Sequence, residues 1–128
     1  MILFALVLAQ VSAPPAAEPP ATDVVVIGEK LKTWRASWRS RGGKTTCVTT
    51  RSSGDIAIDA IGCAALTGCA DQYTPRVVAL AQDKTLTPKA RKEAGLALNT
   101  SLGKCMAARR DTLIVELADK RAAARPGS

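Results

Sequence analysis

A helix is predicted by residues 55–69, whose sequence is DIAIDAIGCAALTGC. Asp55 is placed to cap the first turn, and Ile58, Ile61 and Ala65 recur at the spacing of one helical face. The glycines and alanines among them would let a second helix approach closely. This stretch therefore predicts a helix that packs its apolar face against a neighbour.

Two Thr-Pro pairs predict further helix starts. Thr74-Pro75 and Thr87-Pro88 each place a capping hydroxyl before a proline at the first helical position. The second pair opens a long helical stretch over residues 88–124, with large apolar side chains near one face. These side chains are Leu98, Leu102, Met106, Leu113 and Leu117.

Extended elements are predicted ahead of residue 55. The β-branched run Asp23–Ile27 predicts a short strand or extended arm, and Thr45–Thr50 predicts a strand or extended loop. Between them, Leu31, Trp34 and Trp38 recur at helical spacing, although a strand would also place both tryptophans on one face. The expected fold is mainly α, a small disulfide-stapled helical domain with a short N-terminal extended or β element.

The four cysteines, Cys47, Cys63, Cys69 and Cys105, include no C-x-x-C pair and predict two disulfides. If Cys63 and Cys69 share a helix, their spacing puts them on nearly opposite faces, which discounts a bond between them. Cys47 then pairs with either of the two, and Cys105 pairs with the other. A zinc site would need all four thiolates without any histidine, so no metal is expected.

The N-terminal residues predict export. The apolar run Ile2–Ala9 is followed by small residues, as in a secretory signal peptide, here residues 1–13. As a helix this run would be about 12 Å long, too short for a hydrocarbon core of roughly 30 Å. A Pro/Ala linker follows at 14–22, then a single small domain at 23–125 and a frayed tail at 126–128. We expect a periplasmic or secreted protein with no transmembrane segment after signal removal.

The net charge of +7 can be assigned to residues 30–51, which we call the basic segment. It holds seven of the eighteen bases and no acid, so the eleven bases elsewhere match the eleven acids. A local surplus of one sign favours an anionic partner. The two tryptophans are assigned either to this surface or to the core. The candidate partner-binding residues are Lys30, Lys32, Trp34, Arg35, Trp38, Arg39, Arg41, Lys44 and Arg51.

Catalytic patterns are scarce in this sequence. The absence of histidine excludes histidine-based triads and general bases. Asp55 and Asp59 lie one helical turn apart and would form a carboxylate pair, but a helix cap plus an exposed acid in the first turn explains them more simply. The sequence RGGKTT at 41–46 lacks the first glycine of a phosphate-binding loop. We therefore expect no enzyme activity and no cofactor.

The sequence thus favours a non-catalytic exported protein, a binding or adaptor module for an anionic envelope component. The partners considered are anionic polysaccharide, lipid headgroups or an envelope protein, with nucleic acid as a further polyanion. One alternative is a protein–protein interaction or inhibitor module without anion binding. The other is an enzyme that uses the aspartate pair.

One short segment, Thr22–Glu29 with the sequence TDVVVIGE, resembles the TonB box near the mature N-terminus of many proteobacterial outer-membrane receptors. The resemblance covers eight residues. It implies an extended arm that docks by strand addition. An ordinary first strand after a linker is the other interpretation of the same residues.

Overall fold

The computed structural model describes residues 20–126, so the expected signal peptide and most of the expected linker lie outside the described residues. The mainly α-helical, disulfide-linked fold class is confirmed. In chain order the elements are α1 (Pro20–Leu31), β1 (Arg35–Arg41), β2 (Lys44–Arg51), α2 (Ile56–Gln82) and α3 (Pro88–Ala124).

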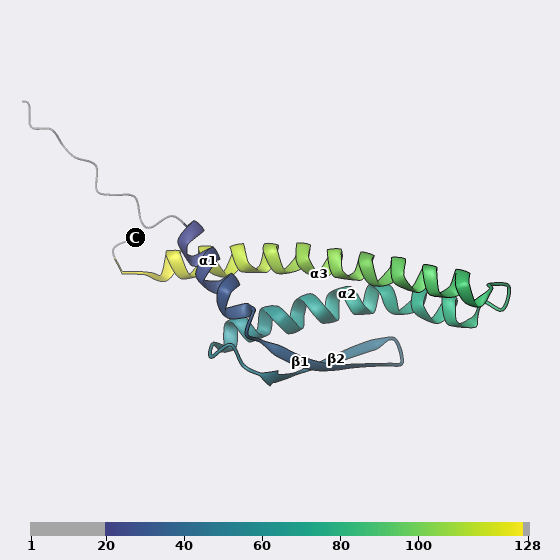
Figure 1. Ribbon diagram of the computed structural model, residues 1–128. Coiled ribbons are helices and arrows are strands. Elements are labelled where there is room, and N and C mark those ends of the chain that lie inside the picture. Colours follow the sequence, from purple (N-terminus) through teal and green to yellow (C-terminus); the bar gives the residue numbers. More distant parts are fainter. Residues whose placement is uncertain (1–19, 127–128) are drawn as a thin grey trace, which may run out of the picture.

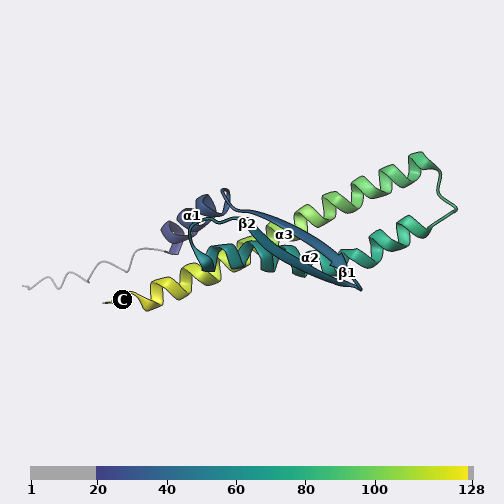
Figure 2. The ribbon, with the colours of Figure 1, turned by 90° about the horizontal axis from the view of Figure 1, so that it is seen from below.

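The two long helices, α2 and α3, lie side by side and antiparallel (Figure 1). Helix α1 packs across the end of this pair that holds the start of α2 and the end of α3, and the β1–β2 hairpin lies along α2 (Figures 1 and 2). The far end of the α2–α3 pair extends beyond the hairpin (Figures 1 and 2). Within residues 20–126 no helix is long and apolar enough to cross a membrane.

Helix α1 replaces the strand or extended arm expected at Asp23–Ile27, so this prediction was wrong. Ile27 and Leu31 are buried one turn apart, and Val24 packs against the same core, which is the spacing of a helical face. Burial of this face outweighs the β propensity of the valines, because tertiary packing supplies most helical stability in proteins. The segment that resembles a TonB box is therefore helical and not an extended arm.

Of the two structures considered for Leu31, Trp34 and Trp38, the helix is wrong, because α1 ends at Leu31, and the strand holds for Trp38, which lies in β1. Strand β1 pairs with β2 as an antiparallel hairpin, which confirms the strand expected at Thr45–Thr50. The turn contains Gly42 and Gly43 with φ of 60° and 76°. Positive φ at both central residues is the requirement of a type I′ hairpin turn, which glycine meets without a Cβ penalty.

The start of α2 is as predicted, but a second start is not. Asp55 caps the helix by accepting from the backbone N–H groups of Ala57 and Ile58 at 3.0 and 3.4 Å. No helix begins at Thr74-Pro75, because α2 continues through Pro75 to Gln82. The Thr74 hydroxyl instead donates to the carbonyl of Ala70 at 2.7 Å, inside the helix. The lost N–H of Pro75 removes one hydrogen bond from a helix that packing against α3 keeps together.

Helix α3 begins after Thr87, whose hydroxyl accepts from the N–H of Ala90 at 3.1 Å, as the second Thr-Pro pair predicts. It runs without interruption to Ala124. Its buried positions are Ile114 and Ala118, next to the half-buried Leu113 and Leu117 of the expected stripe. The core therefore lies at the end of the bundle where α1, α2 and α3 meet. Its members are Ile27, Leu31, Trp34, Ile58, Ile61, Ile114 and Ala118.

Two disulfides hold these layers together. Cys47–Cys63 joins β2 to α2, and Cys69–Cys105 joins α2 to α3. This is one of the two connectivities that the helical spacing of Cys63 and Cys69 left open. The hairpin and both long helices are thus covalently linked.

Candidate anion-binding surface

The bases of β1 and β2 lie on a two-stranded ribbon, residues 35–51, which we call the cationic hairpin. Arg39 pairs with Thr46 and Arg41 with Lys44 across the strands. Directly paired residues share one face of a ribbon, and successive residues alternate between faces. Trp38 pairs with Cys47, whose disulfide points to α2. Arg39, Arg41 and Lys44 therefore share the opposite, outward face near the turn, and all three are exposed.

The other two bases lie at the open end of the cationic hairpin. Arg35 pairs with Arg51, beyond an irregularity between Arg35 and Ala36. The guanidinium of Arg35 donates to the backbone carbonyls of Lys32 and Trp34, both at 2.8 Å. The two strands contain five bases and no acid. Within residues 20–126 none of the five forms an ion pair.

Of the remaining two bases, Lys30 lies in the last turn of α1 and Lys32 lies in the turn that follows the helix. Lys32 forms an exposed ion pair with Glu29 at 2.8 Å, a kind of contact that contributes little in water. The structure therefore divides the seven bases between the outward face near the hairpin turn, the open end of the hairpin, and the last turn of α1 with the residues that follow it. All seven remain exposed.

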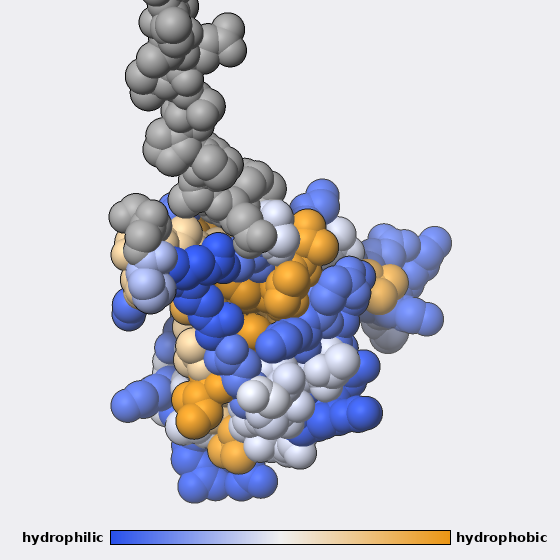
Figure 3. Space-filling view, turned by 90° about the vertical axis from the view of Figure 1, so that its left-hand side faces the viewer, coloured by the Kyte–Doolittle hydropathy of each residue, from blue (hydrophilic) through white to orange (hydrophobic). Residues whose placement is uncertain are grey.

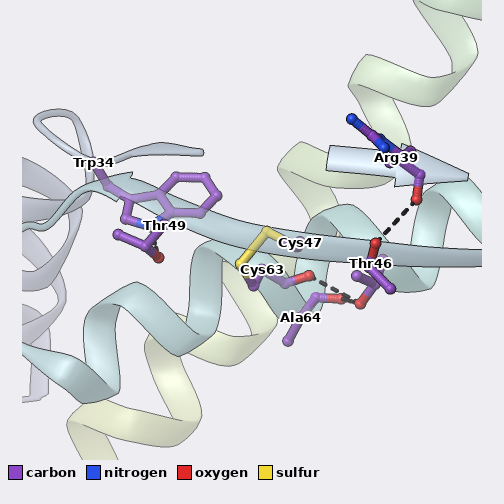
Figure 4. Close-up of a disulfide and its surroundings, with 8 residues drawn as sticks. Trp34, Arg39, Thr46, Cys47, Thr49, Cys63 and Ala64 are labelled. Atoms are coloured by element: carbon purple, nitrogen blue, oxygen red, sulfur yellow. Dashed lines mark hydrogen bonds between the residues drawn. A yellow bond between two sulfur atoms is a disulfide. The ribbon is translucent and has the colours of Figure 1, made fainter. Parts of the chain in front are cut away.

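The turn end of the cationic hairpin is fixed to α2. Asp71 accepts from the backbone N–H of Thr45 at 2.7 Å, and Thr45 is buried. The disulfide Cys47–Cys63 anchors the middle of the ribbon two residues away (Figure 4). The outward bases therefore stand on a rigid support. Asp71 also places one negative charge on the inner side of the ribbon.

The two tryptophans have different environments. Trp34 is only 6% exposed: its indole N–H donates to the hydroxyl of Thr49 at 2.9 Å, and its ring lies against Gly62 of α2. Trp38 is 50% exposed. Trp34 is therefore a core residue, whereas Trp38 is open to a partner.

The aspartates at the start of α2 have structural partners. Asp55 caps the helix and forms an ion pair with Arg121 of α3 at 2.6 Å. Asp59 accepts from the hydroxyls of Ser52 and Ser53 at 2.5 and 2.6 Å. The hydrogen bond from Arg121 lowers the pKa of Asp55, and the hydroxyl of Ser52 does the same to the pKa of Asp59. Two carboxylates held ionised by separate partners lend no support to an acid–base pair.

One basic residue of this region was not predicted from the sequence. Arg110 of α3 places its guanidinium carbon 5.9 Å from the centre of the Trp34 ring, beside the basic segment. Arg110 is far from the basic segment along the chain, and no local sequence pattern marks it as part of this region. Between residues 20 and 126 no group of three or more Cys, Asp or Glu side chains is placed to hold a metal ion.

Comparisons with protein-family models, with curated proteins and with solved structures find no match for this chain. The two disulfides indicate an oxidising environment, extracellular or periplasmic.

Proposed function

We propose that this chain is a non-catalytic binding module that holds an anionic component of the cell envelope through the cationic hairpin, in the periplasm or outside the cell. The observation that carries the proposal is the five bases on one rigid ribbon that contains no acid. A surface of one sign attracts polyanions and raises their local concentration. The apolar run at the N-terminus and the disulfides support export.

The spacing of the bases suits a ligand with repeated charges. Alternate residues on a strand are about 6.6–6.8 Å apart, so Arg39 and Arg41 lie within the screening length of about 8 Å at physiological ionic strength. Lys44 adds a third charge directly opposite Arg41. Single exposed ion pairs contribute little, and several neighbouring charges are needed to hold a polyanion. Anionic polysaccharide and lipid headgroups both offer such repeated charges.

The experiment compares two variants that each lose four positive charges. The hairpin variant carries Arg39→Gln, Arg41→Gln, Lys44→Gln and Arg51→Gln. The distal variant carries Lys84→Gln, Lys89→Gln, Lys92→Gln and Lys104→Gln, at exposed positions outside the basic segment. Arg35 is retained because it bonds to backbone carbonyls.

The readout is co-sedimentation of each folded, oxidised protein with washed envelope fragments. We expect the wild type and the distal variant to sediment with the fragments and the hairpin variant to stay in solution. Equal sedimentation of the two variants would contradict the proposal, because it would show that total charge and not the cationic hairpin decides binding.

A second candidate function is a protein–protein interaction module that needs no anion. Exposed apolar side chains on α1 favour it: Val25 is 63% and Val26 47% exposed. Figure 3 shows hydrophobic surface bordered by hydrophilic residues at the end of the molecule where α1 lies. Envelope binding that survives both the hairpin variant and high salt would favour this function.

A further inference from the structure

A groove lies where α1, β1, α2 and α3 meet, separate from the outward face of the cationic hairpin. It has a volume of about 300 Å³, at the lower end of the range for small-molecule sites. Its apolar lining comes from Leu31, Trp34, Ala36, Trp38, Leu66 and Met106.

Every charged residue that lines this groove is a base. These are Lys32, which directly follows α1, Arg35 of β1 and Arg110 of α3. A neighbouring hollow of about 390 Å³ shares Leu31, Lys32 and Arg110 but is also lined by Glu29 and Asp111. The acids therefore lie on the far side of the shared bases. Glu29 forms its exposed ion pair with Lys32, whereas Arg35 and Arg110 form no ion pair within residues 20–126, so an anion is favoured on the groove side.

Arg110 is the most informative of the three bases. Its Nε is buried without a partner, and within residues 20–126 its guanidinium makes no hydrogen bond or ion pair. The group is held over the face of Trp34, which fixes its place beside the groove. The two terminal nitrogens of Arg110 are not among the buried unpaired atoms of residues 20–126, so they are accessible to an acceptor. A ligand in the groove can supply that acceptor, because Arg110 lines it.

We propose that this groove binds one alkyl chain of an anionic lipid, with the acidic head on Arg110 and Lys32 and the chain between Trp34, Trp38 and Met106. Burial of each methylene group against such a lining stabilises the complex, and methionine adapts to flexible chains. Phosphate and carboxylate heads both accept hydrogen bonds from guanidinium and ammonium groups. This site goes beyond the proposed function, because its charges are not those of the outward hairpin face.

The test uses monomeric dodecyl phosphate as the probe and tryptophan emission as the readout. The chain has two tryptophans, Trp34 and Trp38, and both line the groove. We expect a saturable blue shift, because the chain excludes water from the half-exposed Trp38. The Trp38→Phe variant should lose most of this shift.

Three further probes separate head from chain. Dodecyltrimethylammonium carries the same chain with the opposite charge, dodecyl maltoside carries it without charge, and methyl phosphate carries the head without the chain. We expect each to bind at least about tenfold more weakly than dodecyl phosphate. Equal binding of the cationic and anionic amphiphiles, or of methyl phosphate and dodecyl phosphate, would overturn the proposal.

Variants separate this site from the cationic hairpin. Arg110→Gln should weaken dodecyl phosphate at least about tenfold, since a hydrogen bond to a charged group is typically worth such a factor. Lys104→Gln, which removes one exposed positive charge elsewhere on α3, should leave the affinity unchanged. Unchanged affinity in Arg110→Gln would refute the site.

The hairpin variant should keep its affinity for dodecyl phosphate while it loses envelope binding. Failure of the groove proposal would leave the envelope result of the hairpin variant intact, so the two proposals fail separately. If dodecyl phosphate binding is lost in the hairpin variant and kept in Arg110→Gln, the amphiphile binds the hairpin and the groove proposal is wrong.

Discussion

Replacement of Gly62 by alanine tests the contact on which the position of Trp34 depends. A Cβ at residue 62 would lie 2.7 Å from each of three ring atoms of Trp34, a separation that packed atoms do not tolerate. The ring cannot move freely, because it is buried, donates to Thr49 and lies under Arg110. Overpacking of this kind typically costs about 1–3 kcal/mol.

The matched control is Gly103→Ala in α3, where an added Cβ meets nothing within 4 Å. Both glycines lie inside helices, so alanine gains roughly 0.5–1 kcal/mol of helix stability at each position. This gain cancels when the two variants are compared, and the difference of about 1–3 kcal/mol is the packing cost at Gly62 alone.

The assay is thermal unfolding of both oxidised variants, followed by circular dichroism. For a domain of this size 1 kcal/mol corresponds to roughly 4 °C or more, so Gly62→Ala should melt at least about 4 °C below Gly103→Ala. Gly103→Ala should melt slightly above the wild type. Equal melting temperatures, or a higher one for Gly62→Ala, would refute the packing of Trp34 against α2.

Three further predictions concern stability. Oxidised protein should react with no thiol reagent until it is reduced, and free thiols in it would contradict the two disulfides. Reduction should lower the free energy of unfolding by about 3 kcal/mol for the disulfide that spans 16 residues, and by somewhat more for the one that spans 36. Arg121 lowers the pKa of Asp55, so the ion pair stabilises the fold above the usual aspartate pKa near 3.8 and loses this effect as the pH falls. The free energy of unfolding of Asp55→Asn, measured in denaturant titrations, should therefore fall less on acidification than that of the wild type, and equal falls would exclude the ion pair. Ile58→Ala, at a fully buried position, should lower the free energy of unfolding by about 2–5 kcal/mol, and Leu102→Ala, at a half-buried position outside the core cluster, should lower it less. Urea unfolding measures both, and the reverse order would mean that the core is misplaced.

The helices that could be predicted are those with a local signal. Asp55 and Thr87 are capping residues at the right places, and both helices begin there. Thr74-Pro75 carries the same signal but lies inside a helix that packing against α3 sustains. A local pattern marks where a helix can begin. It carries no information on whether packing against a neighbouring helix keeps an earlier helix continuous through that point.

The segment from residue 20 to residue 51 was harder to predict because tertiary packing decides its structure. The valines before Gly28 favour a strand, yet Ile27 and Leu31 are buried at helical spacing against α3. Trp34 and Trp38 fit either period. The Gly-Gly turn was the available signal for a hairpin, since two glycines between β-rich runs are typical of a type I′ turn.

The candidate site was predicted in part. The run of bases from residue 30 to 51 was visible in the sequence, but its division between the end of α1 and the two ends of the hairpin follows from the element bounds and the strand register. Arg110 could not be found, because it reaches the basic segment only through the packing of α3 against Trp34.

The most direct test of the cationic hairpin is the salt dependence of binding to a defined polyanion such as dextran sulfate, measured by titration for the wild type, the hairpin variant and the distal variant. Exposed charges are screened by salt, so wild-type affinity should fall steeply as ionic strength rises. The distal variant should follow the wild type, whereas the hairpin variant should bind weakly at low salt and change little as salt is added. Superimposable titrations of the two variants at every salt concentration would contradict the account.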